Sequence, residues 1–151
     1  MKRHLPETYL ICLLLFLTSL NALIAGAGLL IFSDGKWIGL PLSWLDGTPF
    51  HSFRIPGLLL FTFIGLGCLL TTIGFLVQPA WQWPQRLNIY KNKFWAWTFS
   101  VYCGIMLCVW IIVQQLLTDY FILQPIISAI GTLVLILTLL PRVQLHYTKN
   151  S

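Results

Sequence analysis

Long uncharged runs alternate with short polar connectors along the chain. Four of these runs contain no Asp, Glu, Lys or Arg: residues 9–32, 55–77, 94–118 and 120–141. Each has roughly 20 residues or more, and at a rise of about 1.5 Å per residue such a helix crosses a hydrocarbon core of about 30 Å. A spanning β-strand would instead show about ten residues of alternating character. Because a helix satisfies its own backbone hydrogen bonds in lipid, the pattern predicts an all-α protein with transmembrane helices.

The predicted architecture is a four-helix transmembrane bundle that forms a single integral membrane domain over residues 1–151. The expected spans are approximately 9–32, 55–77, 95–118 and 121–141. Small residues within these spans favour close helix packing in lipid. Gly67 and Gly74 lie two helical turns apart and predict one smooth face. A homo-oligomer could form through one of these small-residue faces, and the pattern does not choose between them.

Composition agrees with this class. Of the 151 residues, 58% are hydrophobic and 9% are charged. A soluble domain carries about 25% charged residues, because it needs a polar surface against water. The sequence therefore predicts no soluble domain.

Basic residues gather in alternate polar segments, and this distribution predicts the orientation. Seven of the nine lie at Lys2 and Arg3, in the connector 86–93, and in the tail at Arg142 and Lys149. With four spans, these three groups share one side of the membrane. Basic residues in short loops stay in the cytoplasm, so both termini are expected there (N-in/C-in). A basic face on anionic lipid accounts for the net charge of +5, so membrane lipids are expected partners and nucleic acid is not.

The N-terminal segment has a second interpretation. "MKRH", an apolar run and "AGA" at residues 25–27 resemble a signal peptide with a small-residue cleavage site. Cleavage would leave three spans and the same cytoplasmic C-terminus, so the charge distribution does not decide between the two interpretations.

Six tryptophans lie near the ends of the predicted spans, a distribution typical of aromatic belts at the membrane interface. They are Trp37, Trp44, Trp81, Trp83, Trp95 and Trp97.

The connector between the first two spans contains the stretch "WLDGTPFHSFRIPG" at residues 44–57, the densest polar cluster between two apolar runs. Thr48 followed by Pro49 is typical of a helix start, because the hydroxyl caps and the proline needs no N–H there. Pro56 and Gly57 are expected to kink the second span. These features predict a folded lid on the outer side of the membrane.

The candidate site is an outer cluster of charged and amide side chains. Its members are Asp46, His51, Arg54, Gln114, Asp119 and Gln124. The connector charges are expected to pair with one another and with Asp119. Arg54 is the expected anchor, because its planar fork can bridge a carboxylate and an amide. A structural cap is the favoured interpretation, and a site for a ligand or partner is the alternative.

The third span has the most polar interior. Trp110 and Gln114 share one helical face, Gln115 lies on the neighbouring face, and Gln124 opens the last span at similar depth. These side chains could line a small amphipathic pocket. Interhelical hydrogen bonding is the favoured alternative, because such bonds hold helices together in lipid.

No catalytic, metal or cofactor motif is present in the sequence. Cys12, Cys68, Cys103 and Cys108 lie inside the spans without redox spacing, so they are interpreted as packing residues. His4 and His146 alone would make an incomplete metal site. No enzymatic activity and no cofactor are therefore expected.

A proton-coupled transporter usually keeps an ionisable residue at mid-membrane, and the predicted spans contain none. Small multidrug transporters need a carboxylate within the first helix, and Glu7 lies too close to the inner surface to match.

The run "LDGTPFHSFRIPG", together with "FILQPIISAIG" near the end, resembles a group of small bacterial integral membrane proteins. The shared pattern is Gly-Thr-Pro-Phe and Pro-Gly after the first span, and Leu-Gln-Pro at the start of the last. The resemblance implies a bacterial four-span protein of the cytoplasmic (inner) membrane. It implies no activity and no catalytic residues.

The expected function is that of an accessory or scaffolding component, which binds a lipid or a membrane-protein partner through its outer cap. The alternative is a small oligomeric transporter or channel. A transport path needs a hydrated interior, whereas a scaffold has a dry one.

The orientation can be tested with reporters. A fluorescent reporter fused after Ser151 should be active in the cytoplasm, and a phosphatase that requires the periplasm should be active when inserted near Gly47, because of the Lys and Arg distribution. Phosphatase activity at the C-terminus would contradict the predicted orientation.

Overall fold

The computed structural model describes residues 5–149, and their regular secondary structure is helical apart from one isolated antiparallel bridge between Lys93 and Thr148. The all-α prediction is confirmed. Within these residues, three helices are long and apolar enough to cross a membrane: α1 (Pro6–Ile31), the continuous helix Arg54–Val77, and α5 (Trp95–Leu117). A shorter apolar helix, α6 (Leu123–Leu139), follows the third of them.

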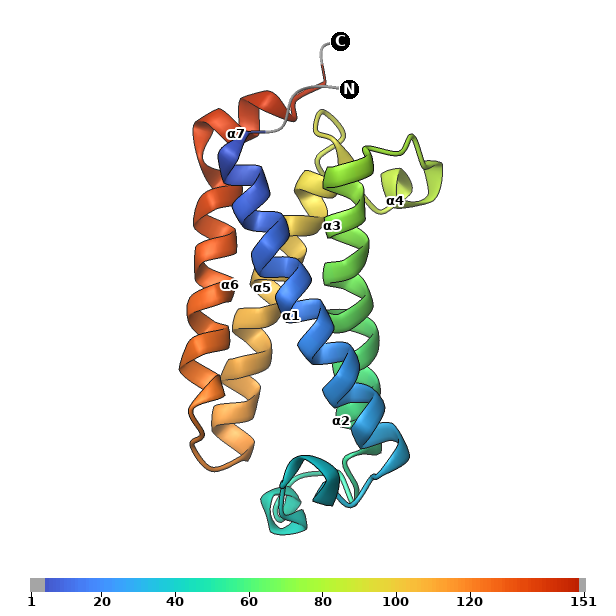
Figure 1. Cartoon of the computed structure of the whole chain (residues 1–151), viewed down its shortest axis with the longest axis vertical. Coiled ribbons are helices and arrows are strands. Elements are labelled where there is room, and N and C mark those ends of the chain that lie inside the picture. Colours follow the sequence, from blue (N-terminus) through green and yellow to red (C-terminus); the bar gives the residue numbers. More distant parts are fainter. Residues whose placement is uncertain (1–4, 150–151) are drawn as a thin grey trace.

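These helices run side by side along the long axis of the molecule (Figure 1). α1 crosses in front of α5, from α6 at one end of the molecule to α2 at the other. A short final helix, α7 (Pro141–His146), lies at the end where α1 begins. Consecutive long helices are therefore antiparallel, and the chain returns to its starting end.

The second long helix differs from the expectation. It comprises α2 (Arg54–Leu59), a π-helical stretch η3 (Leu60–Leu66) and α3 (Gly67–Val77). Pro56 lies in the first turn, where no intrahelical N–H is required, and the Gly57 N–H donates to the Phe53 carbonyl at 2.8 Å. The irregularity expected at Pro56 and Gly57 therefore occurs later, in η3.

Small residues bring α1 and the second helix into backbone contact. A Cβ atom on Gly26 would lie 2.8 Å from the backbone N of Phe61 and 2.9 Å from the Gly57 carbonyl oxygen. The Ser19 hydroxyl donates to the Gly65 carbonyl at 2.7 Å. Close packing through small residues is thus present, but at positions other than Gly67, where a Cβ would meet only the end of one methionine side chain at 3.7 Å.

The belt interpretation is wrong for Trp95 and Trp97, which are 1% and 3% exposed. The Trp95 Nε1–H donates to the Pro79 carbonyl at 3.2 Å, and the Trp97 Nε1–H donates to the Thr138 carbonyl at 2.8 Å. Since each indole nitrogen has a partner inside the protein, both rings can pack in the core.

The connector between α3 and α5 contains α4 (Gln82–Arg86) and is built around a fully buried asparagine, Asn88. The Asn88 Oδ1 accepts from the Thr98 hydroxyl, and its Nδ2 donates to the Lys93 carbonyl at 2.9 Å. The Phe94 N–H donates to the Tyr147 carbonyl at 2.8 Å, which ties this connector to the segment after α7. This end of the molecule is therefore tightly closed.

The backbone contact at Gly26 gives a matched pair of variants. Gly26→Ala is expected to lower the free energy of unfolding by about 1–3 kcal/mol, because backbone atoms cannot make room for a methyl group. Gly67→Ala has room and gains helix propensity of up to about 1 kcal/mol, so its stability should be unchanged or higher. Thermal unfolding in detergent measures both, and equal shifts would contradict the packing described.

Candidate functional site: a pocket beneath the first connector

The first connector, residues 32–53, is folded. It contains two short 3₁₀ helices, η1 (Lys36–Ile38) and η2 (Leu42–Leu45). Leu45 and Phe53 are buried in a small cluster together with Leu29 of α1. The Phe53 N–H donates to the Ser33 carbonyl at 2.9 Å, so the two ends of the connector are joined.

Two local turns set the course of this connector. The Thr48 hydroxyl donates to the Leu45 carbonyl at 2.8 Å and accepts from the Phe50 N–H at 3.2 Å. Thr48 therefore closes a turn, and the helix start expected at Thr48 is wrong, because α2 begins at Arg54. Gly35 has φ of +76°, and a Cβ there would also meet the Leu40 carbonyl oxygen at 2.5 Å.

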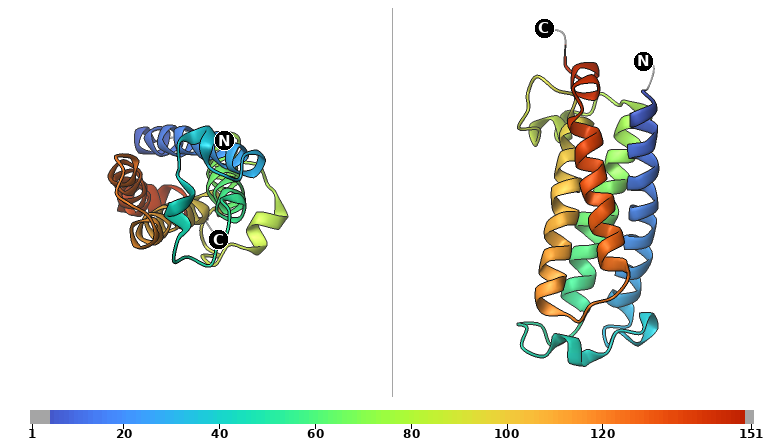
Figure 2. Two further views of the ribbon diagram at one scale, coloured as in Figure 1. Left: turned by 90° about the horizontal axis from the view of Figure 1, so that it is seen from below. Right: turned by 90° about the vertical axis from the view of Figure 1, so that its left-hand side faces the viewer.

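Trp44 links the first connector to the helix pair α5 and α6. Its ring stacks on Phe121, in the turn between α5 and α6, with ring centroids 5.7 Å apart and an interplanar angle of 28°. The connector lies across the lower end of the helices in Figures 1 and 2. It thus closes this end of the molecule with an aromatic contact.

A cavity of about 500 Å³ lies between the first connector and the helices. This is within the range of small-molecule sites, which hold about 300–1,000 Å³. Its aromatic lining residues are Trp37, Trp44, Phe50, Phe53, Trp110 and Phe121. Its polar lining residues are Asn21, Thr48, Gln114 and Thr118. No Asp, Glu, Lys, Arg or His is among the residues that line it.

The amide side chains of the predicted cluster have different environments. Gln114 lines the cavity, and its Oε1 is shielded from solvent and accepts no hydrogen bond from the described residues. Gln124 is fully buried, and its Nε2 donates to the Thr118 hydroxyl at 3.4 Å and to the Asp119 carbonyl at 3.5 Å. The bonds of Gln124 stay within the turn between α5 and α6 and do not join two helices, whereas Gln114 and Trp110 line a pocket.

Sequence reasoning missed Asn21, which lines the same cavity from α1. An amide ten residues before the end of an apolar span was the available signal, because a polar side chain at that depth needs a partner.

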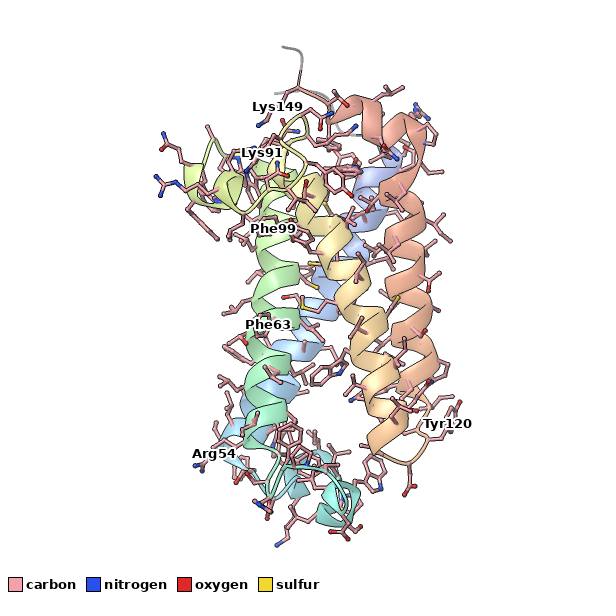
Figure 3. All side chains as sticks on the ribbon, turned by 180° about the vertical axis from the view of Figure 1, so that it is seen from behind. Arg54, Phe63, Lys91, Phe99, Tyr120 and Lys149 are labelled. Atoms are coloured by element: carbon pink, nitrogen blue, oxygen red, sulfur yellow. The ribbon has the colours of Figure 1, made fainter. Side chains whose placement is uncertain are left out.

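The charged members of the predicted cluster do not gather at the cavity. Asp46, His51 and Arg54 are exposed on the first connector, and Asp119 is exposed in the α5–α6 turn. Arg54 points away from the molecule, on the side opposite Tyr120, in Figure 3. The expected anchor pairing of Arg54 with Asp119 is absent, because aromatic side chains occupy the space between the connector and that turn and the charges remain hydrated.

The ion pairs of residues 5–149 lie elsewhere. Lys36 Nζ is 3.3 Å from Asp34 Oδ2, and Arg142 Nη1 is 3.2 Å from Glu7 Oε1. The Lys36 backbone N–H, 3.2 Å from Asp34 Oδ1, lowers the pKa of that exposed carboxyl. Neither pair borders the cavity.

The described residues contain no group of three or more His, Cys, Asp or Glu that could hold a metal ion. His4 lies outside the described residues. The four cysteines are free thiols within the helices, and Cys103 lies 3.4 Å from the Thr71 hydroxyl.

No family model, no curated protein and no solved structure matches this chain. The resemblance of "LDGTPFHSFRIPG" and "FILQPIISAIG" to small bacterial membrane proteins therefore stays a prediction.

The aromatic closure predicts which connector residues matter for stability. Trp44→Ala should lower the free energy of unfolding by about 1–3 kcal/mol, because it removes the stack on Phe121 and opens the cavity. Arg54→Ala should change it by no more than about 0.5 kcal/mol, because the side chain is exposed and forms no ion pair with any of residues 5–149. Thermal melts in detergent measure both. A larger loss of stability for Arg54→Ala than for Trp44→Ala would contradict the aromatic closure and support Arg54 as the anchor of the connector.

Proposed function

We propose that this chain is a multi-pass membrane protein that holds one lipid molecule in the pocket beneath its first connector. Such a protein serves as an accessory or scaffolding component of the membrane. The observation that carries the proposal is the cavity of about 500 Å³, which has an uncharged, largely aromatic lining and a folded connector across its end.

The proposal includes four membrane crossings. α6 has 17 residues, at the lower limit of about 17–25 for a spanning helix, and it packs along α5. The basic residues favour cytoplasmic ends and a periplasmic first connector in a bacterial inner membrane, as the resemblance also implies. The cavity then opens in the outer half of the bilayer.

The core between the cavity and the opposite end favours binding over conduction. Ile11, Leu15, Phe75, Trp95 and Val134 are at most 1% exposed and belong to one packed cluster. An ion or polar solute would need a hydrated path, and these apolar side chains offer none within a single chain. An oligomeric transporter or channel would require such a path between copies.

Lipid retention tests the proposal. Native mass spectrometry of protein purified from bacterial membranes in mild detergent should show one adduct of lipid mass per chain. Ala25→Phe should reduce this adduct, because Ala25 lines the cavity and the larger ring would occupy part of the space that the lipid needs.

Ala27→Phe is the matched control. It makes the same change two residues along α1, outside the cavity lining, and should retain the adduct. Absence of an adduct from the wild-type protein, or equal loss in both variants, would contradict the proposed function.

A further inference from the structure

We infer that the pocket selects a neutral, single-chain lipid whose head group carries a hydroxyl, and that Gln114 binds this hydroxyl. The inference rests on the proposed function and specifies its ligand.

The lack of charged residues in the cavity lining limits which lipid head groups can bind. The cavity lining contains no Asp, Glu, Lys, Arg or His. The nearby cations do not compensate, because Lys36 is 86% exposed and paired with Asp34, and Arg54 points outward. A phosphate or carboxylate head in this cavity would lose its hydration without gaining a counter-charge, so a neutral head is favoured.

The volume of the cavity limits how many hydrocarbon chains the lipid can have. About 500 Å³ is the size of a small-molecule site, and one medium-length chain with a small head group fits this space. A single-chain lipid is therefore favoured over a larger two-chain lipid.

Gln114 supplies the polar contact. Gln114 lines the cavity, its Oε1 is shielded from solvent and has no donor among the described residues, and a buried acceptor without a partner is costly. Its backbone is already fixed, because the Thr118 N–H and the Thr118 hydroxyl both donate to the Gln114 carbonyl, at 2.8 Å and 2.9 Å. Because no described residue bonds to the side-chain Oε1, a rotation of the carboxamide toward the cavity would let it accept the proton of a ligand hydroxyl.

The position of Gln114 also orients the ligand. Gln114 lies in the last turn of α5, whereas Asn21 and Trp110 reach the cavity from deeper in the helices. The hydroxyl head is thus placed near the first connector, and the chain runs inward along Trp110.

The test uses tryptophan fluorescence in phosphatidylcholine vesicles that contain the full chain. The probes are a terminally brominated dodecanol, its methyl ether and the corresponding brominated carboxylate, whose bromine quenches the tryptophans of the cavity lining. The alcohol should bind about two- to tenfold more tightly than the ether, the value of one neutral hydrogen bond, and also more tightly than the carboxylate.

Two glutamine variants then assign the contact. Gln114→Leu should bring the ratio of alcohol to ether affinity to about one, and continued binding of the ether would show that the variant is folded. Gln115→Leu, the control at an exposed position outside the lining, should keep the wild-type ratio. Displacement of the brominated alcohol by monolauroylglycerol or by farnesol distinguishes an acyl from an isoprenoid ligand.

The outcomes separate the two proposals. Equal alcohol and ether affinities in the wild-type protein, tightest binding of the carboxylate, or a wild-type ratio in Gln114→Leu would overturn the inference and leave lipid binding intact. If none of the three probes quenched the wild-type protein above its Ala25→Phe variant, the proposed function would fail as well.

Discussion

The close backbone contact between α1 and α2 determines the shape of the molecule. Gly26 and Gly57 lie so near each other that an added Cβ on either would meet backbone or Cβ atoms of the other helix. This contact holds the end of α1 against α2 and away from α6, beside which α1 begins (Figure 1). The pair formed by α1 and α2 and the pair formed by α5 and α6 therefore leave a cavity between them at one end. The first connector closes this cavity through Trp44 and Phe121.

The two ends of the molecule differ in how their interior is filled. At the α7 end, buried groups such as Asn88 and Thr98 bond to each other and to the backbone, and large aromatic side chains fill the core. At the connector end a cavity remains, and Gln114, which lines it, has no donor for its Oε1 among the described residues. Glu7 Oε2 and Gln124 Oε1 are likewise shielded and without a partner within residues 5–149, so the cavity, and not an unpaired oxygen alone, supports a ligand at the connector end.

Much of the fold could be predicted from the sequence, because lipid imposes a strict requirement on length and on backbone hydrogen bonding. The expected spans 9–32, 55–77 and 95–118 agree with the observed helices within a few residues. The tryptophans near the span ends were harder to assign. Trp95 and Trp97 occupy sequence positions typical of an interfacial belt, and only their hydrogen bonds to Pro79 and Thr138 explain their burial.

The candidate site was predicted in part. Gln114 and Trp110 share a helical face and do line a pocket, since their spacing fixes their direction. The prediction of the site relied on the charges at Asp46 and Arg54 more than on the aromatic residues beside them. In the structure, aromatic contacts fold the connector. Which of several neighbouring side chains enters an apolar interior depends on tertiary packing, and local sequence does not encode it.

Whether the pocket beneath the first connector holds a lipid can be seen in an experimental structure of the protein in lipid nanodiscs. We expect one elongated density in the cavity, with its polar end within hydrogen-bonding distance of Gln114 Oε1 and its chain along Trp110. A cavity filled by the connector's own side chains, or a connector detached from Phe121 with no density beneath it, would show that the pocket holds no lipid.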